Sequence, residues 1–137
     1  PNYDMFVYPS IFEETSCASA LEALASGVHV ITNNFGALYE TCAEWPVYVN
    51  YSTNYETMAK DTAAAIEVAA KYLHEDFIQN HLEEQQKFYK RFYNWEKKGM
   101  EWTSFLKGIF YNGCNTCTQR MLYSLHASFT RATATMY

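Results

Sequence analysis

The alternation of short apolar runs with helix-forming segments over residues 1–50 constrains the fold more than any other feature of this chain. Three runs are rich in β-branched and aromatic residues and fit short strands, of which we expect the first two to be buried: residues 5–8, 28–32 and 47–49. Between the first two, residues 16–26 are mostly Ala, Leu and Ser, and Gly27 follows where a helix closes in the left-handed conformation. Residues 38–43 fit a shorter second helix. This order predicts three parallel strands joined by two helices.

From residue 55 the pattern changes to long amphipathic helices. Mostly apolar residues form one stripe at spacings of three or four along each of two segments: Met58, Thr62, Ala65, Ile66, Ala69 and Leu73, then Phe77, Ile78, Leu82, Gln85, Tyr89 and Phe92. A third helix is expected from Trp95 to Leu106, with Gly99 as a weak point that costs about 1 kcal/mol relative to Ala. The expected fold is α/β, with a parallel sheet of about three strands, helices on both faces and long helices after it.

We expect three parts along the chain. Residues 1–52 form the βαβ portion, residues 53–111 form a helical portion of the same domain, and residues 112–137 form a Ser/Thr-rich tail in which neither period is clear. A length of 137 residues suits one domain, and an apolar fraction of 49% excludes general disorder. The chain is therefore too short for a complete two-domain enzyme.

Charge and cysteine content limit the partners and the compartment. A net charge of −5 disfavours nucleic acid, which requires clustered Lys and Arg. No apolar run approaches the roughly 18 residues of a membrane helix. The four cysteines are too unevenly spread for a disulfide scaffold, and the Cys114-x-x-Cys117 pair has no second pair to complete a metal site. We expect a cytoplasmic location, with peripheral membrane attachment of the intact protein left open, and no metal or cofactor.

The segment most informative about chemistry runs from residue 8 to residue 27, through the expected strand, loop and helix. In open parallel sheets, ligands bind at the carboxyl ends of the strands, where this loop lies. Small residues after Glu14 would leave the backbone N–H groups of Thr15, Ser16, Cys17 and Ala18 at a helix N-terminus, where a phosphate is favoured. The loop therefore predicts an anion site that needs no Lys.

Two carboxylates, Glu14 and Glu22, bracket the first two turns of that helix. Eight residues at about 100° each place them on neighbouring faces, roughly 12 Å apart along the axis. Carboxylates accept hydrogen bonds from vicinal hydroxyls, so the pair suits a diphosphate flanked by two sugars, as in a nucleotide-diphosphate sugar. The alternative is a purely structural role, in which Glu14 caps the helix and Glu22 is a solvated surface residue.

The residues of this segment resemble a known family. The run Tyr-Pro-Ser-x-Phe-x-Glu-Thr-Ser-Cys-x-x-Ala-Leu-Glu-Ala-x-Ala-x-Gly at 8–27 is similar to the donor-binding motif of the large group-1 (family 4-like) retaining glycosyltransferases, which have the GT-B fold. Gly-Val-His-Val-Ile-Thr at 27–32 and Phe-Gly-Ala-Leu-Tyr-Glu at 35–40 resemble the strand and turn that follow, with His29 in place of the usual Pro. Tyr-Asn-Trp-Glu at 93–96 resembles the family's closing helix. The resemblance covers about residues 3–107.

The resemblance implies a role for each residue of the motif. Glu14 and Thr15 would contact the donor sugar, Glu22 the ribose hydroxyls, and the backbone at Ser16, Cys17 and Ala18 the diphosphate. Ser16 and Cys17 stand where the family often has Phe-Gly, and a side chain at Cys17 leaves less room for a phosphate. These roles imply a Rossmann-like donor-binding portion of a GT-B C-terminal domain, acting in carbohydrate biosynthesis.

Three further residues lie outside that motif. Glu40 follows Gly36-Ala37 at the start of a helix near the expected cleft, and it either caps that helix or contacts ligand. His29 lies in a strand, which favours a buried, hydrogen-bonded imidazole over a catalytic base. His81 falls on a mostly polar helix face, where we expect it to be solvated.

The resemblance also implies what is missing. An intact enzyme of this kind has an N-terminal domain with the acceptor site and a cationic diphosphate clamp, neither of which precedes Pro1. We therefore expect no catalytic residue in this fragment and no sugar transfer by the isolated chain. A non-catalytic interaction module is the alternative function. An open strand edge and the aromatic helix predict a homo-oligomer.

Overall fold

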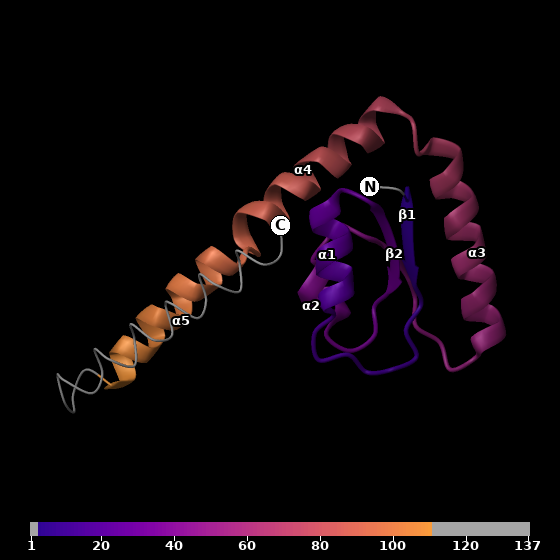
Figure 1. Ribbon diagram of the computed structural model, residues 1–137. Helices are drawn as coiled ribbons and strands as arrows, with labels where there is room; N and C mark the ends of the chain where they lie inside the picture. The colour runs from indigo at the N-terminus through magenta and orange to yellow at the C-terminus, as the bar shows by residue number, and fades with distance from the viewer. Residues whose placement is uncertain (1–2, 111–137) are drawn as a thin grey trace. The chain divides into compact units, whose positions relative to one another are not determined.

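The computed structural model describes residues 3–110 (Figure 1). Its elements, in chain order, are β1 (Met5–Tyr8), α1 (Ala18–Ser26), β2 (His29–Asn33), α2 (Leu38–Cys42), β3 (Val47–Val49), α3 (Tyr55–Tyr72), α4 (Asp76–Phe92) and α5 (Trp95–Phe110). The expected tail at 112–137, with Cys114 and Cys117, lies outside the described residues. The chain divides after Arg91 into two compact units, and each is described by itself.

The three strands form a parallel sheet in the order β1-β2-β3, as the alternation of runs predicts. Tyr8 at the end of β1 pairs with Thr32 of β2, and Thr32 pairs with Tyr48 of β3. Every residue of β2 is buried, because a strand flanks it on each side and helices cover both faces. β1 is only partly buried, and 36% of Val7 is exposed, so the expectation that both of the first two strands are buried is wrong for β1.

Helices cover both faces of the sheet, and neighbouring side chains of β2 point to opposite faces, so they pack in different cores. Val30 packs in a core with residues of α1, α2 and α4, including Leu24, Leu38 and Tyr89. Ile31, the next residue, packs in a second core with Val49 and Ala69 of β3 and α3. Figure 1 shows α1 and α2 on one side of the strands and α3 on the other. The expected α/β architecture is confirmed at this level.

The bounds of α1 differ from the expected helix at its start. The helix begins at Ala18, two residues later than expected, because Cys17 has an extended backbone with φ −119° and ψ 96°. It closes as expected at Gly27, whose φ of 76° is in the left-handed region. The N–H group of Val28 then donates to the Ala23 carbonyl at 3.3 Å.

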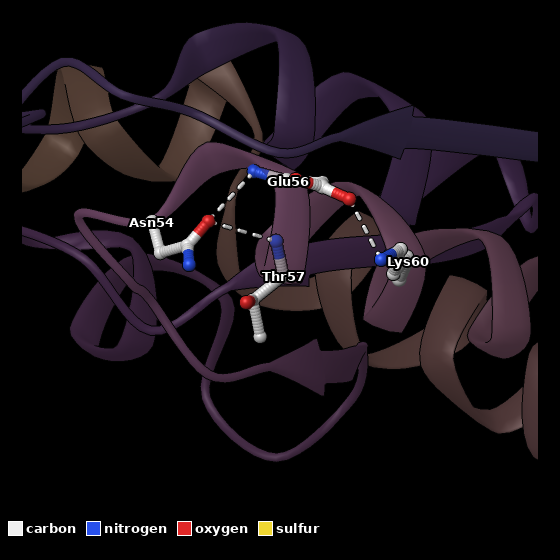
Figure 2. A network of polar contacts seen from close by, with 4 residues as sticks. All are labelled: Asn54, Glu56, Thr57 and Lys60. Atoms are coloured by element: carbon white, nitrogen blue, oxygen red, sulfur yellow. Dashed lines mark hydrogen bonds and ion pairs between the residues drawn. The ribbon is translucent and has the colours of Figure 1, made fainter.

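A side-chain cap fixes the start of α3 just after β3. Asn54 Oδ1 accepts hydrogen bonds from the N–H groups of Glu56 at 3.1 Å and Thr57 at 3.2 Å (Figure 2). Such caps stabilise a helix by about 1 kcal/mol. Glu56 also forms an exposed ion pair with Lys60, with 2.8 Å between Oε1 and Nζ.

Polar side chains of α4 fasten this helix to the C-terminal ends of α1 and α2. Gln85 Nε2 donates to the carbonyls of Leu24 at 3.0 Å and Val28 at 3.1 Å. The Tyr89 hydroxyl donates to the Cys42 carbonyl at 2.9 Å. Gln85 and Tyr89 are fully buried, whereas Phe77 is exposed, so the predicted apolar stripe is correct in its middle but not at Phe77.

The helix α5 runs through Gly99 without interruption and has no fully buried residue. Trp95, Trp102 and Phe105 are 61%, 56% and 58% exposed, and the rings of Trp102 and Phe105 meet edge to face at 5.7 Å. Of the helices within residues 3–110, none combines the length and apolarity that crossing a lipid bilayer requires.

Candidate functional site at the carboxyl edge of the sheet

The three parallel strands end at one edge, and contacts between loops join the segments that follow them. Asn34 Nδ2, after β2, donates to Asn50 Oδ1, after β3, at 3.3 Å. Asn34 Oδ1 accepts from the N–H group of Tyr51 at 2.9 Å, and the rings of Phe35 and Tyr51 stack with centroids 3.9 Å apart. This edge is where ligands bind in open α/β sheets.

Glu14 lies in the loop after β1 and is held on both its side chain and its backbone. The Tyr8 hydroxyl donates to Glu14 Oε1 at 2.5 Å, and the N–H group of Ala37 donates to the Glu14 carbonyl at 2.7 Å. The bond to Glu14 raises the pKa of Tyr8, because the carboxylate favours the protonated phenol. We call Tyr8, Gly36 and Ala37 the Glu14 clamp.

Gly36 belongs to the clamp because only glycine fits there. Its φ of 59° is in the left-handed region, and a Cβ at this position would lie 2.7 Å from both the backbone N and the backbone O of Glu14. The two loops therefore touch backbone to backbone.

The first part of the same loop is anchored to the end of β2. Ser10 Oγ accepts from the N–H group of Phe12 at 3.1 Å, and the Ser10 carbonyl accepts from Asn33 Nδ2. Asn33 is fully buried, and its Oδ1 has no hydrogen-bond partner among residues 3–110. Ile11 and Phe12, between these anchors, are exposed.

The residues of the expected anion site, 15–18, divide into two groups. Thr15 and Ser16 are exposed and precede the helix. Cys17 is the N-cap, and its side chain belongs to the core shared by α1 and α2, so it does not fill the space before the helix. The first intrahelical bond runs from the N–H group of Leu21 to the Cys17 carbonyl, so the N–H groups of residues 17–20 have no acceptor within the helix. The free amides thus lie about two residues later than the segment 15–18.

The other two carboxylates differ in their surroundings. Glu22 is exposed on α1, one turn before Ser26, whose hydroxyl donates to the Glu22 carbonyl at 2.7 Å. Glu40 is exposed in the first turn of α2, whose N-cap residue, Ala37, makes no side-chain cap bond. Both roles expected for Glu40, capping α2 and contacting ligand, stay predictions.

Two histidines lie away from this edge. His29, the first residue of β2, is buried as expected, but its Nε2 has no hydrogen-bond partner in the described part of the chain. Burial and the neighbouring His81 lower the pKa of His29. His81 is half-buried, and its Nε2 lies 3.1 Å from the Trp45 carbonyl, so the expectation of a solvated His81 is wrong.

A groove of about 420 Å³ lies beside His29, far from the carboxyl edge in the strand direction. Val47 at the start of β3 lines it, with Val68 and Tyr72 of α3 and Phe77 of α4. Its lining is almost entirely apolar, so it lacks the carboxylates and amides that the candidate site provides. Within residues 3–110 there is no group of three or more His, Cys, Asp or Glu side chains that could hold a metal ion.

The sequence interpretation missed the clamp and the anchor at Asn33. Tyr8 was part of the motif, but nothing in its spacing indicated that the phenol reaches Glu14. Gly36 carried a usable signal, since a glycine after a buried strand often marks a close backbone approach. Comparisons with known proteins found no matching family model, no similar curated protein and no similar solved structure.

Proposed function

We propose that this chain is the donor-binding portion of a retaining GT-B glycosyltransferase and that it binds a nucleotide-diphosphate sugar. In the intact protein the bound glycosyl group would be transferred with retention. Glu14 would bind hydroxyls of the donor sugar and Glu22 the ribose hydroxyls. Thr15 would contact the donor sugar with Glu14, and the α1 N-terminus at Cys17 and Ala18, together with Ser16, would receive the diphosphate. No cofactor takes part.

The observation that carries the proposal is the fixed position of Glu14 in the loop that leads directly into the free amides of α1. A carboxylate and a helix N-terminus at one edge of a parallel sheet offer acceptors for sugar hydroxyls and donors for phosphate oxygens. The motif at residues 8–27 supports the same assignment, as do the loop contacts of Asn34 and Asn50, which complete that edge.

Titration calorimetry of the 137-residue chain tests this function. The probes are UDP-glucose, GDP-mannose and ADP-glucose, and we expect one of them to bind. Glu14→Ala and Glu22→Ala should each weaken that binding at least about fivefold, which corresponds to the loss of one hydrogen bond of about 1 kcal/mol. Glu40→Ala serves as a second-site comparison, and Glu84→Ala on the exposed face of α4 is the matched control. Absence of binding by all three probes would contradict the proposal.

A second function, a non-catalytic interaction module, is favoured by one observation. Five large apolar side chains of α5 are each more than half exposed: Trp95, Met100, Trp102, Phe105 and Ile109. Exposed apolar surface of this kind marks association sites. Under this alternative the chain would bind none of the three donors but would associate with itself, and light scattering would report the larger mass.

A further inference from the structure

We propose that Tyr8 is a positioning residue for Glu14, and that its phenol selects the carboxylate orientation in which Glu14 recognises the donor sugar. The inference rests on the proposed function, because it assumes that the ligand of Glu14 is the sugar of a nucleotide-diphosphate sugar. It adds a residue to which the motif interpretation gave no role.

The first argument is that the two carboxylate oxygens of Glu14 differ in their hydrogen bonding. Oε1 of Glu14 accepts from the Tyr8 hydroxyl, whereas no hydrogen bond reaches Oε2 from any of residues 3–110. One oxygen is therefore fixed by the protein and the other is left to accept from a ligand hydroxyl. A carboxylate bonded on one oxygen has far fewer orientations to lose when a sugar binds.

The second argument is that Tyr8 is itself held rigidly. Its carbonyl accepts from Thr32 Oγ1 at 2.8 Å, and its strand position pairs with Thr32 in the sheet register. Its ring stacks on Phe6, two residues earlier on the same face of β1, with centroids 5.9 Å apart and planes 16° apart. Because the sheet fixes the position of Tyr8, the phenol in turn fixes the orientation of the Glu14 carboxylate.

The third argument is that the rest of the clamp fixes the Glu14 backbone but leaves its side chain free. Ala37 bonds to the backbone carbonyl, and Gly36 contacts the backbone N and O. Neither restrains rotation about the side-chain bonds of Glu14. Of the clamp residues, only Tyr8 touches the carboxylate, so its loss should change recognition and not the path of the loop.

The test compares affinities for a nucleotide sugar and for its nucleoside diphosphate in the same chain. In the wild type, the donor found by calorimetry should bind more tightly than the matching UDP, GDP or ADP, since only the donor carries the sugar. Tyr8→Phe should reduce donor affinity about tenfold and leave diphosphate affinity within about twofold. A purely structural role would lower both affinities together.

Two controls make the result specific. Tyr48→Phe removes a phenol that donates to the Ala43 carbonyl at 2.6 Å, away from Glu14, and should keep the wild-type ratio of the two affinities. In a Glu14→Ala background, Tyr8→Phe should have no further effect on donor affinity, because the carboxylate that accepts the phenol proton is gone. An additional loss in that background would show that Tyr8 acts by another route and would overturn the proposal.

A measurement without ligand tests the contact between Tyr8 and Glu14 directly. The NMR titration of tyrosine Cζ, with Tyr8 identified by its loss in Tyr8→Phe, should show its pKa falling in Glu14→Ala. If the wild type binds donor and diphosphate equally, or binds neither, the proposed function fails and the positioning role fails with it. If the wild type prefers the donor and Tyr8→Phe keeps that preference, the positioning role alone is wrong.

Discussion

At the scale of single residues, the candidate site depends on contacts that join the loop after β1 to the loop after β2. Glu14 receives a bond from Tyr8 six residues before it and another from Ala37 twenty-three residues after it. Such a residue is fixed only when the sheet has formed, because its partners belong to two different strand ends. Substitutions in these loops should therefore affect ligand binding and stability together when they disturb the backbone.

Gly36→Ala tests how much the close approach of the two loops contributes to stability. An alanine would adopt a left-handed φ and would place Cβ 2.7 Å from the Glu14 backbone, so the variant should lose about 3 kcal/mol of unfolding free energy. Urea unfolding measures the loss. Gly108→Ala is the control, because a Cβ there meets nothing within 4 Å and the residue is helical, so stability should not fall. Equal stability of Gly36→Ala and the wild type would contradict the close approach of the loops.

His29 gives the protein a pH dependence with a defined sign. Burial makes the charged imidazole unfavourable in the folded chain, so its pKa is lower folded than unfolded. Its contribution to stability is complete above the unfolded pKa of about 6.5 and is lost as the pH falls below that value, because the unfolded chain binds the proton first. His29→Val should remove this loss, which amounts to at most about 1.4 kcal/mol per pH unit.

Urea midpoints at pH 7.5 and 5.5 check the His29 prediction. The wild type should lose more stability over this interval than His29→Val does. Val28→Ala, at the neighbouring buried position, is the control, because it destabilises the core without removing an imidazole and should keep the wild-type difference. An unchanged difference in His29→Val would show that other groups set the pH dependence.

At the scale of elements, the hydrogen bonds from α4 to the carbonyls at the end of α1 should contribute a large part of the free energy of unfolding. Gln85 is fully buried, and its Nε2 donates hydrogen bonds to the carbonyls of Leu24 and Val28 at the end of α1. Gln85→Ala would leave these two carbonyls without that donor and open a cavity, so we expect a loss of about 3 kcal/mol. Gln86→Ala removes a more exposed bond to the Ser26 carbonyl and should cost less than about 1 kcal/mol. Similar losses in the two variants would contradict this account.

The elements themselves were largely predictable from the sequence, whereas the contacts of the site were not. The strand at residues 5–8, the closing Gly27 and the α3 stripe through Met58 and Ala69 follow from local period and propensity. The start of α1 was misplaced because Ser16 and Cys17 are compatible with a helix locally, yet Cys17 is extended and turns its side chain into the core. The bonds of Glu14 to Tyr8 and Ala37 arise from the tertiary approach of two loops and leave no periodic signal.

At the scale of the whole molecule, the residues proposed to bind the donor all lie in the first compact unit, Pro1–Arg91. This unit contains the whole sheet, and its last helix is anchored near its end by the bond from Tyr89 to the Cys42 carbonyl. The binding function and the association surface should therefore be separable. The exposed aromatic side chains of α5, including Trp95 and Trp102, belong to the second unit.

A chain ending at Arg91 tests this separation. It should unfold cooperatively and bind the donor with an affinity within about twofold of the full chain, because it keeps the Glu14 clamp and α1. We expect the full chain to self-associate in light scattering and the shortened chain to be monomeric, since the large apolar residues of α5 are more exposed than those of the β1 edge. Trp102→Ser in the full chain should weaken association without changing donor affinity. Persistent association of the shortened chain would instead assign the contact to the open edge of β1, where strand pairing between copies is the physical alternative.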